Sequence, residues 1–239
     1  MQIPILNGIY TDNGPDLRTS YPVNMVPVPK NSGISSGFLR PGDGIVANGS
    51  PLAGIAIPLT LGMMILLLGS VSGAHLNPAV TLYFIAKKGI KTDEAILYIL
   101  AQLAGGLVGA WLGGLYSGVS SLQLNLGEIK NGQFLSEVVA TAGLVWIIGA
   151  LVQNKQGHLI APSVAAWLIA AGTFTTTGAV ANPAVTLGLM FTGGTVQAVG
   201  ANQGLFFVLA QVVGVLVALL GVTFVTGGGL KAAKGKKKK

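Results

Sequence analysis

Five long apolar stretches constrain the fold of this chain more than any other feature of its sequence. They cover approximately residues 52–71, 94–116, 134–152, 159–176 and 204–226. As a helix, each is long enough to cross about 30 Å of hydrocarbon. Charged residues make up only 9% of the 239 residues, whereas a soluble domain carries about a quarter. The chain is therefore predicted to be an all-α protein that crosses a lipid bilayer five times.

The basic residues are concentrated at the C-terminal end. The net charge is +7, and six of the 14 Lys and Arg residues lie in 231–239. Such a tail beside an apolar segment is typical of a cytoplasmic flank that meets anionic headgroups. Nucleic-acid binding is not expected, because no aromatic side chains alternate with the basic ones.

The remaining lysines support the same orientation. If the tail is cytoplasmic, Lys87, Lys88, Lys91 and Lys155 share its side, while the opposite loops contain only Lys130. This bias predicts an integral membrane protein with its C-terminus in the cytoplasm. We expect the membrane to be a bacterial plasma membrane.

Residues 1–50 differ from the rest of the chain. They are polar and rich in proline, and they contain no apolar run of the roughly 20 residues needed to span a bilayer. They also lack the basic start and apolar core of a secretory signal. We therefore expect three parts: an N-terminal segment over 1–50 that does not span, a membrane domain over 51–230, and a Lys-rich tail over 231–239.

A short motif occurs twice in the membrane domain. The first copy reads SGAHLNPAVTL, from Ser72 to Leu82, and the second reads TGAVANPAVTLG, from Thr177 to Gly188. The asparagines of the two copies are 105 residues apart. Matching flanks around both copies indicate an internal duplication.

Each copy is predicted to start a short helix. Asn77 and Asn182 would be the N-caps, and Pro78 and Pro183 the first helical residues. Ala79 and Ala184 complete the two Asn-Pro-Ala triplets. The apolar runs end at Ala86 and Phe191, so each helix rises about 13.5 Å, roughly half a bilayer. Two such half-helices entering from opposite faces would meet near the midplane.

That meeting point has a predictable chemistry. Both helix dipoles would direct their positive ends at one spot, which disfavours cations. With its side-chain oxygen occupied in capping, each Asn is predicted to keep its amide NH2 free to donate into a lumen. Two such donors would orient water or a hydroxyl group and interrupt a chain of proton-conducting waters.

The chain resembles the major intrinsic proteins, the aquaporin and glycerol-channel family. The resemblance covers about 51–226 and includes both NPA loops, AQLAGGLVGA (Ala101–Ala110) and SEVVAT (Ser136–Thr141). It implies an inverted-repeat bundle with two half-helices, assembled as a homotetramer. It also implies a passive channel for water or small uncharged solutes such as glycerol, urea or ammonia.

The resemblance places four residues in an outer constriction: Ile57, Ala170, Ala179 and Val185. In water-selective members this ring contains a His and an Arg, and the Arg follows the second NPA directly. Here that position is Val185, so the implied ring is apolar and wider. Loss of the fixed cation shifts the expectation from water towards bulkier or less polar solutes.

Two further residues carry roles implied by the family. Glu137 would accept backbone N–H groups of the second NPA loop, with proton transfer as the alternative. His75 would hold the first loop near the cytoplasmic mouth, with a pH gate as the alternative. Family members open each repeat with a helix that carries such a Glu; in the first repeat residues 1–50 stand in its place, so that helix is expected to be missing.

Residues 1–50 suggest a second function class. The segment YPVNMVPVPKNSGISSGFLRPGDGI resembles the start of head-completion proteins of short-tailed phages, which stabilise packaged DNA. The alternative to a channel is thus a non-conducting, phage-associated or structural membrane protein with a vestigial pore.

Catalysis is not expected from this sequence. It has no Cys, two His and a single acid within an apolar stretch, so it lacks the residues for an active site, a metal site or a cofactor site. A coupled transporter would also need ionisable groups along its path. A passive channel remains the leading hypothesis.

Overall fold

The computed structural model describes residues 53–116, 124, 126–191 and 199–225. All of them belong to one compact unit, Ser35–Lys239. These residues form helices and connecting turns, with no strand in the described ranges. The expected segments 1–50 and 231–239, and with them the expectation of a missing first helix, lie outside the described residues.

Within the described residues, five helices are long and apolar enough to cross a membrane, in agreement with the prediction. A 3₁₀ turn, η2 (Gly157–Leu159), leads into the fourth of them. The five are α1 (Ala53–Ser72), α3 (Thr92–Tyr116), α4 (Gln133–Gln153), α5 (Ile160–Phe174) and α7 (Ala201–Val225).

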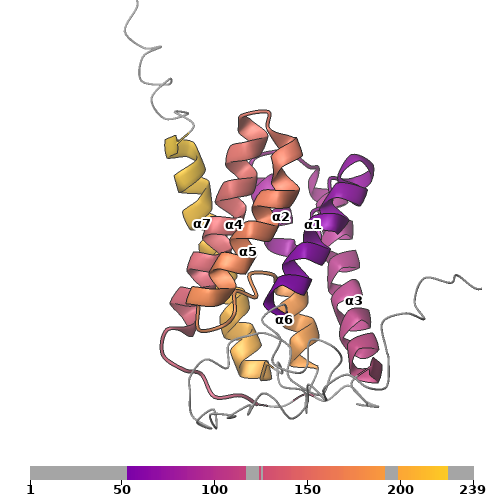
Figure 1. The fold of residues 1–239 in the computed structure, drawn as a ribbon, viewed down its shortest axis with the longest axis vertical. Coiled ribbons are helices and arrows are strands. Elements are labelled where there is room, and N and C mark those ends of the chain that lie inside the picture. The colour runs from indigo at the N-terminus through magenta and orange to yellow at the C-terminus, as the bar shows by residue number, and fades with distance from the viewer. Residues whose placement is uncertain (1–52, 117–123, 125, 192–198, 226–239) are drawn as a thin grey trace, which may run out of the picture. The chain divides into compact units, whose positions relative to one another are not determined.

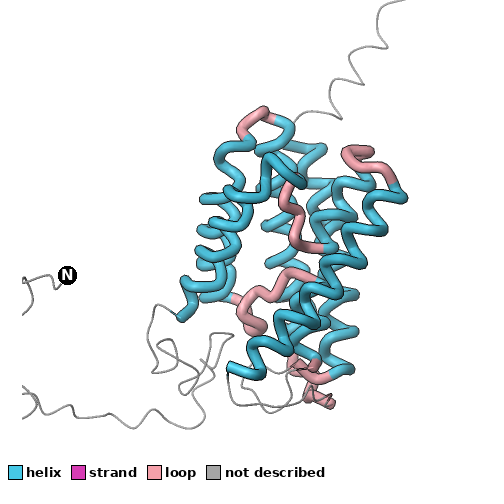
Figure 2. Tube along the Cα trace, turned by 90° about the vertical axis from the view of Figure 1, so that its right-hand side faces the viewer, coloured by secondary structure: helices cyan, strands magenta, loops and turns pink. Residues whose placement is uncertain are grey.

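Two short helices interrupt this series, also as predicted. Helix α2 (Pro78–Ala86) has the predicted bounds, and α6 (Pro183–Met190) ends one residue early because Phe191 is its C-cap. Figure 1 shows both in the middle of the bundle, framed by the longer helices. The loops that lead into them approach each other at mid-height (Figure 2).

The long helices pack in a defined order around the two short ones. Helix α4 lies against α7 and α5, and α5 also contacts α1. Helix α3 contacts α6 and α2, while α6 in turn contacts α7. Each short helix is therefore held between long helices from both halves of the chain.

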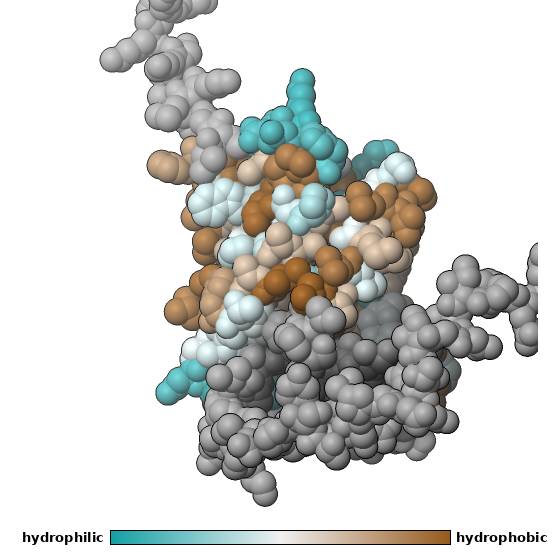
Figure 3. Space-filling view, in the orientation of Figure 1, coloured by the Kyte–Doolittle hydropathy of each residue, from teal (hydrophilic) through white to brown (hydrophobic). Residues whose placement is uncertain are grey.

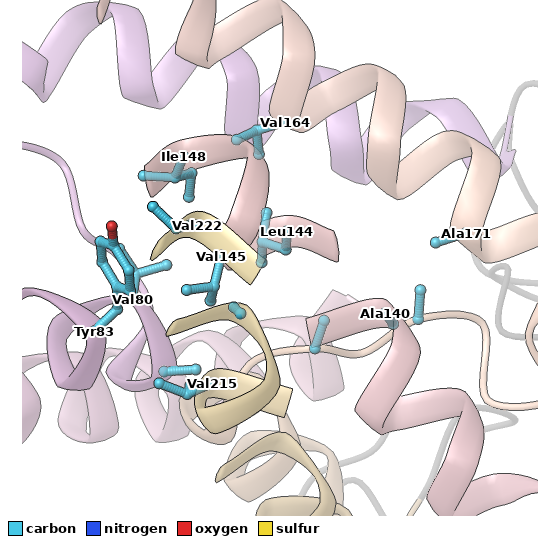
Figure 4. Close-up of a cluster of buried hydrophobic side chains, with 14 residues drawn as sticks. Val80, Tyr83, Ala140, Leu144, Val145, Ile148, Val164, Ala171, Val215 and Val222 are labelled. Carbon is cyan, nitrogen blue, oxygen red and sulfur yellow. The ribbon is translucent and has the colours of Figure 1, made fainter. Parts of the chain in front are cut away.

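The best-buried part of the core lies between α2, α4, α5 and α7. Tyr83 of α2, Val145 of α4 and Val222 of α7 are all less than 3% exposed, and Figure 4 shows their side chains converging. Gly149 makes room for the tyrosine, because a Cβ at this position would lie 2.3 Å from its hydroxyl oxygen. The absence of a side chain at Gly149 thus allows α2 to pack closely on α4.

Large apolar side chains are exposed along the outer helix faces. Leu66 of α1 is 68% exposed, and Leu220 and Phe224 of α7 are 75% and 83% exposed. Figure 3 shows apolar residues over the middle of the visible face and polar residues gathered at the end that carries the α4–α5 connection. This distribution suits a surface covered by lipid rather than water.

Candidate functional site

The two NPA asparagines cap the short helices as predicted. Asn77 Oδ1 accepts a hydrogen bond from Ala79 N at 2.9 Å, and Asn182 Oδ1 accepts one from Ala184 N at the same distance. Both asparagines are extended, with φ of −157° and −153°, and a proline follows each as the first helical residue. The positive ends of both helices therefore point from these asparagines toward the centre of the bundle.

The amide groups of the two asparagines tie the loops together. Asn77 Nδ2 donates to the carbonyl oxygen of Ala181 at 2.8 Å, and Asn182 Nδ2 donates to that of Leu76 at 3.0 Å. The expectation of two fully free amide groups is therefore wrong. Each NH2 has two hydrogens, and one of them is used to bind the opposite loop. In the described part of the chain, only the second hydrogen of each amide is left to donate elsewhere.

The two loops share one backbone conformation. Each has a glycine followed by non-glycine residues at positive φ, a conformation that L-residues adopt only where tertiary contacts hold it. The matching pairs are Gly73 (72°) and Gly178 (71°), Ala74 (45°) and Ala179 (57°), and Leu76 (49°) and Ala181 (47°). The duplication read from the sequence thus extends to the backbone.

Glu137 anchors the second loop. Its Oε1 accepts hydrogen bonds from Thr177 Oγ1 and from Val180 N at 3.1 Å, and its Oε2 accepts one from Ala181 N at 2.9 Å. Gln211 Nε2 of α7 donates to Oε2 at 2.7 Å. The carboxylate is fully buried, and four donors compensate for the loss of water around it.

His75 is fixed within the first loop. Its ring stacks on Phe84 with centroids 4.6 Å apart and meets the edge of Tyr98. Its Nδ1 lies 3.1 Å from Thr81 Oγ1. Burial lowers the pKa of this loop histidine, which lies outside the five spanning helices, so the neutral form is favoured near pH 7.

The four expected constriction residues come from four parts of the bundle. Ile57 lies on α1 and Ala170 on α5, two helices in contact, while Val185 is in the first turn of α6. Ala179 is buried in the second loop, whereas Val185 is 44% exposed and Ile57 52% exposed. All four side chains are apolar.

Comparison with known proteins identifies the family. A family model described as Major intrinsic protein matches residues 42–177, more than half of the chain. The chain belongs to the major intrinsic protein family. The matched range ends five residues before Asn182 and therefore does not include the second NPA triplet. The likeness of the second loop to the first rests on its sequence and its backbone conformation.

Several curated relatives are channels of this family. Aquaglyceroporin AqpS of Rhizobium meliloti is 33% identical over 190 residues, 79% of each chain. Probable aquaporin TIP1-2 of Oryza sativa is 35% identical over 170 residues, 66% of each chain. An aquaglyceroporin of Toxoplasma gondii is 35% identical over 147 residues, 59% of this chain and 55% of that relative. Channels of the major intrinsic protein family pass water or small solutes and are integral membrane proteins.

A second family model matches the other end of the chain. It is described as Bacteriophage P22 Gp10, beta-propeller, and covers residues 1–57. This match agrees with the phage resemblance of the N-terminal segment and overlaps the major intrinsic protein match at 42–57.

The sequence reading missed two Gln–Thr pairs that hold the half-helices in place. Gln102 Nε2 of α3 donates to Thr81 Oγ1 of α2 at 3.0 Å, and Gln211 Nε2 of α7 donates to Thr186 Oγ1 of α6 at 2.9 Å. Each threonine lies four residues after its cap asparagine. The repeated Ala-Gln dipeptide, after each half-helix, was the available signal.

The described residues contain no group of three or more His, Asp or Glu side chains that could hold a metal ion. Their buried polar side chains include Asn77 and Asn182 of the paired loops and Glu137, which binds the second loop.

Proposed function

We propose that this chain forms a passive transmembrane pore for small uncharged solutes, with the paired NPA loops as its central barrier. The observation that carries the proposal is the head-to-head arrangement of α2 and α6, whose cap asparagines exchange hydrogen bonds between loops. Irregular backbone within a bilayer is tolerated where it is buried in protein or lines a water-filled cavity. The facing helix dipoles repel cations at this position.

The apolar constriction residues set the proposed solute preference. Val185 stands where water-selective family members carry an arginine, so the ring has no fixed positive charge. Such a ring offers a solute no strong hydrogen-bond donor and leaves more room than an arginine does. Glycerol, urea and ammonia are therefore the proposed solutes beside water.

Stopped-flow light scattering on proteoliposomes tests conduction. Vesicles that contain the protein should swell faster than empty vesicles in water and glycerol gradients. Equal rates in both gradients would contradict the pore.

The Val185→Arg variant tests the constriction. The control is Val185→Leu, whose side chain is uncharged and close to valine in size. Val185→Arg should reduce glycerol flux more than water flux, because its side chain narrows the ring and still donates hydrogen bonds to water. Equal losses of glycerol and water flux would contradict the assignment of Val185 to the constriction.

A second candidate function rests on the family match of residues 1–57 to the phage protein. In this alternative the chain is a phage-associated or structural membrane protein whose pore does not conduct. Its presence in purified phage particles, together with proteoliposomes that swell no faster than empty ones, would favour it.

The proposed assembly follows the family, and the proposed orientation follows the uneven distribution of the lysines. A homotetramer in a bacterial plasma membrane, with the C-terminus in the cytoplasm, places each pore within one protomer. Mass measurement of the protein in nanodiscs tests the tetramer, and a monomer mass would contradict it.

A further inference from the structure

The C-terminal ends of α2 and α4 have the same backbone pattern. Each has the two hydrogen bonds of a Schellman motif, in which one residue after the helix takes the left-handed conformation. The bonds are Gly89 N to Phe84 O (2.8 Å) and Lys88 N to Ile85 O (3.0 Å) in α2, and Gln156 N to Leu151 O (2.8 Å) and Lys155 N to Val152 O (3.1 Å) in α4. The left-handed residue is Lys88 in α2 and Lys155 in α4, with φ of 56° and 58°.

Lysine is an unusual residue at this position. Glycine is favoured there because it has no Cβ, whereas any other L-residue loses stability in the left-handed conformation. The chain does place a glycine at positive φ directly after α1, at Gly73 (72°). Six non-glycine residues have positive φ in the described part of the chain; four lie in the paired NPA loops, and the other two are Lys88 and Lys155. A strained residue of the same type at two helix ends suggests a role for its side chain.

The two lysine turns lie beside each other. Helix α2 contacts α4, and Tyr83 fits against Gly149, where a Cβ would lie 2.3 Å from the tyrosine hydroxyl oxygen. From this contact, Lys88 is five residues further along α2 and its turn, and Lys155 is six residues further along α4 and its turn. Both helices end at the same end of the bundle (Figures 1 and 2). Since the axes of packed helices lie about 8–10 Å apart, the two lysine side chains can reach one phosphate group between them.

Positive charge dominates this end of the described chain. Lys87 and Lys91 flank the first turn, and both are exposed, as are the two left-handed lysines. The acids at this end are Asp93 and Glu94, which lie in the first turn of α3 and stabilise the N-terminus of that helix. Lys155 lies two residues beyond the spanning segment of α4. The positive charge is therefore at the level where a bilayer presents its phosphate groups.

We propose that Lys88 and Lys155 form a binding site for the headgroup of an anionic phospholipid, with both ammonium groups on its phosphate. A bias of charge between the two faces, or compensation of a helix dipole, needs a lysine only somewhere in the last turn or the connection. Neither explains two lysines at positions that favour glycine. A lipid suits the site better than an acidic protein segment does, because the turns directly follow membrane-embedded helices. The site concerns the surrounding membrane, and it holds whether or not the pore conducts.

Native mass spectrometry of the full chain with added phosphatidylglycerol tests the site, because it counts the lipids bound to each chain. The variants are Lys88→Gly and Lys155→Gly, which remove the ammonium group and relieve the left-handed conformation. Lys130→Gly is the matched control, because it removes the same charge beyond the other end of α4, from a residue that does not have positive φ. All the chains keep the Lys-rich segment 231–239, so its own attraction for the lipid cancels in the comparison.

Lys88→Gly and Lys155→Gly should each bind phosphatidylglycerol about fivefold more weakly than the parent chain, the loss expected for one lysine at an anionic surface. Lys130→Gly should bind it as the parent does. The thermal midpoint in detergent should instead rise by about 2–4 °C for Lys88→Gly and Lys155→Gly, because glycine suits the left-handed turn.

Phosphatidylglycerol binding by Lys88→Gly or Lys155→Gly equal to that of Lys130→Gly would overturn the proposal. A lowered midpoint for either variant would do the same, because the lysines would then stabilise their turns. Displacement of the lipid by an equal concentration of glycerol 3-phosphate or of a hexaglutamate peptide would also overturn it, and would assign the site to a soluble phosphate or to an acidic protein segment.

Discussion

Individual residues provide hydrogen-bond partners for the backbone of the two loops. Backbone N–H and C=O groups outside a helix need partners, because lipid supplies none. The cap asparagines satisfy helix N-termini with their oxygens and the opposite loop with their amides. Glu137 takes the N–H groups of the second loop that the asparagines leave unpaired. The residues at positive φ direct those N–H groups toward the carboxylate.

Glu137→Gln should destabilise the protein by about 2–4 kcal/mol, since an amide accepts through one oxygen only and charge-assisted hydrogen bonds are lost. The thermal midpoint in detergent should fall by about 5–15 °C. Glu128→Gln is the matched control, because Glu128 is exposed, and its midpoint should not change. An unchanged midpoint for Glu137→Gln would contradict the anchoring role.

The sequence predicted the asparagine caps but not the contacts between loops. Asn followed by Pro is a local signal for a helix start, and it was sufficient for Asn77 and Asn182. The bond from Asn77 to Ala181 joins residues 104 apart. Such pairing depends on how the two halves pack, which no local pattern encodes, so the amides were wrongly expected to be free.

At the level of helices, close packing of α3 and α6 positions the second half-helix. A Cβ at Gly106 would lie 2.3 Å from the Ala184 carbonyl oxygen, and one at Gly188 would lie 2.6 Å from the Gly106 oxygen. Two helices can approach this closely only with glycine at the contact. The apolar pattern predicted where these helices run, but not which of the adjacent glycines faces α6.

Gly106→Val should therefore displace α6 and lower stability by about 1–3 kcal/mol or more, as overpacking does. Its neighbour provides the control, since Gly105→Val adds a side chain where no described atom lies within 4 Å. Differential scanning fluorimetry in the same detergent should show a lower midpoint for Gly106→Val only. Equal midpoints for the two variants would contradict the packing of α3 on α6.

Across the described part of the molecule, the two repeats run in opposite directions. The lysines of the connections are divided unevenly between the two ends of the bundle. The α2–α3 and α4–α5 connections are at the same end of the bundle (Figures 1 and 2). Those connections carry Lys87, Lys88, Lys91 and Lys155, and the loop before α4 carries Lys130. The five spans were predictable from apolar length alone, whereas the neighbouring left-handed turns of Lys88 and Lys155 were visible only once the helices were placed.

This charge bias predicts the orientation of the protein in a cell. Positive loops remain in the cytoplasm, so Lys155→Cys and Lys88→Cys should resist a membrane-impermeant maleimide until the cells are permeabilised. Lys130→Cys should react in intact cells, and the cysteine-free parent chain gives the background. Labelling of Lys155→Cys and Lys88→Cys in intact cells, with protection of Lys130→Cys, would place the C-terminal end outside. Different results for Lys88→Cys and Lys155→Cys would contradict the helix topology itself, because both connections lie at one end of the bundle.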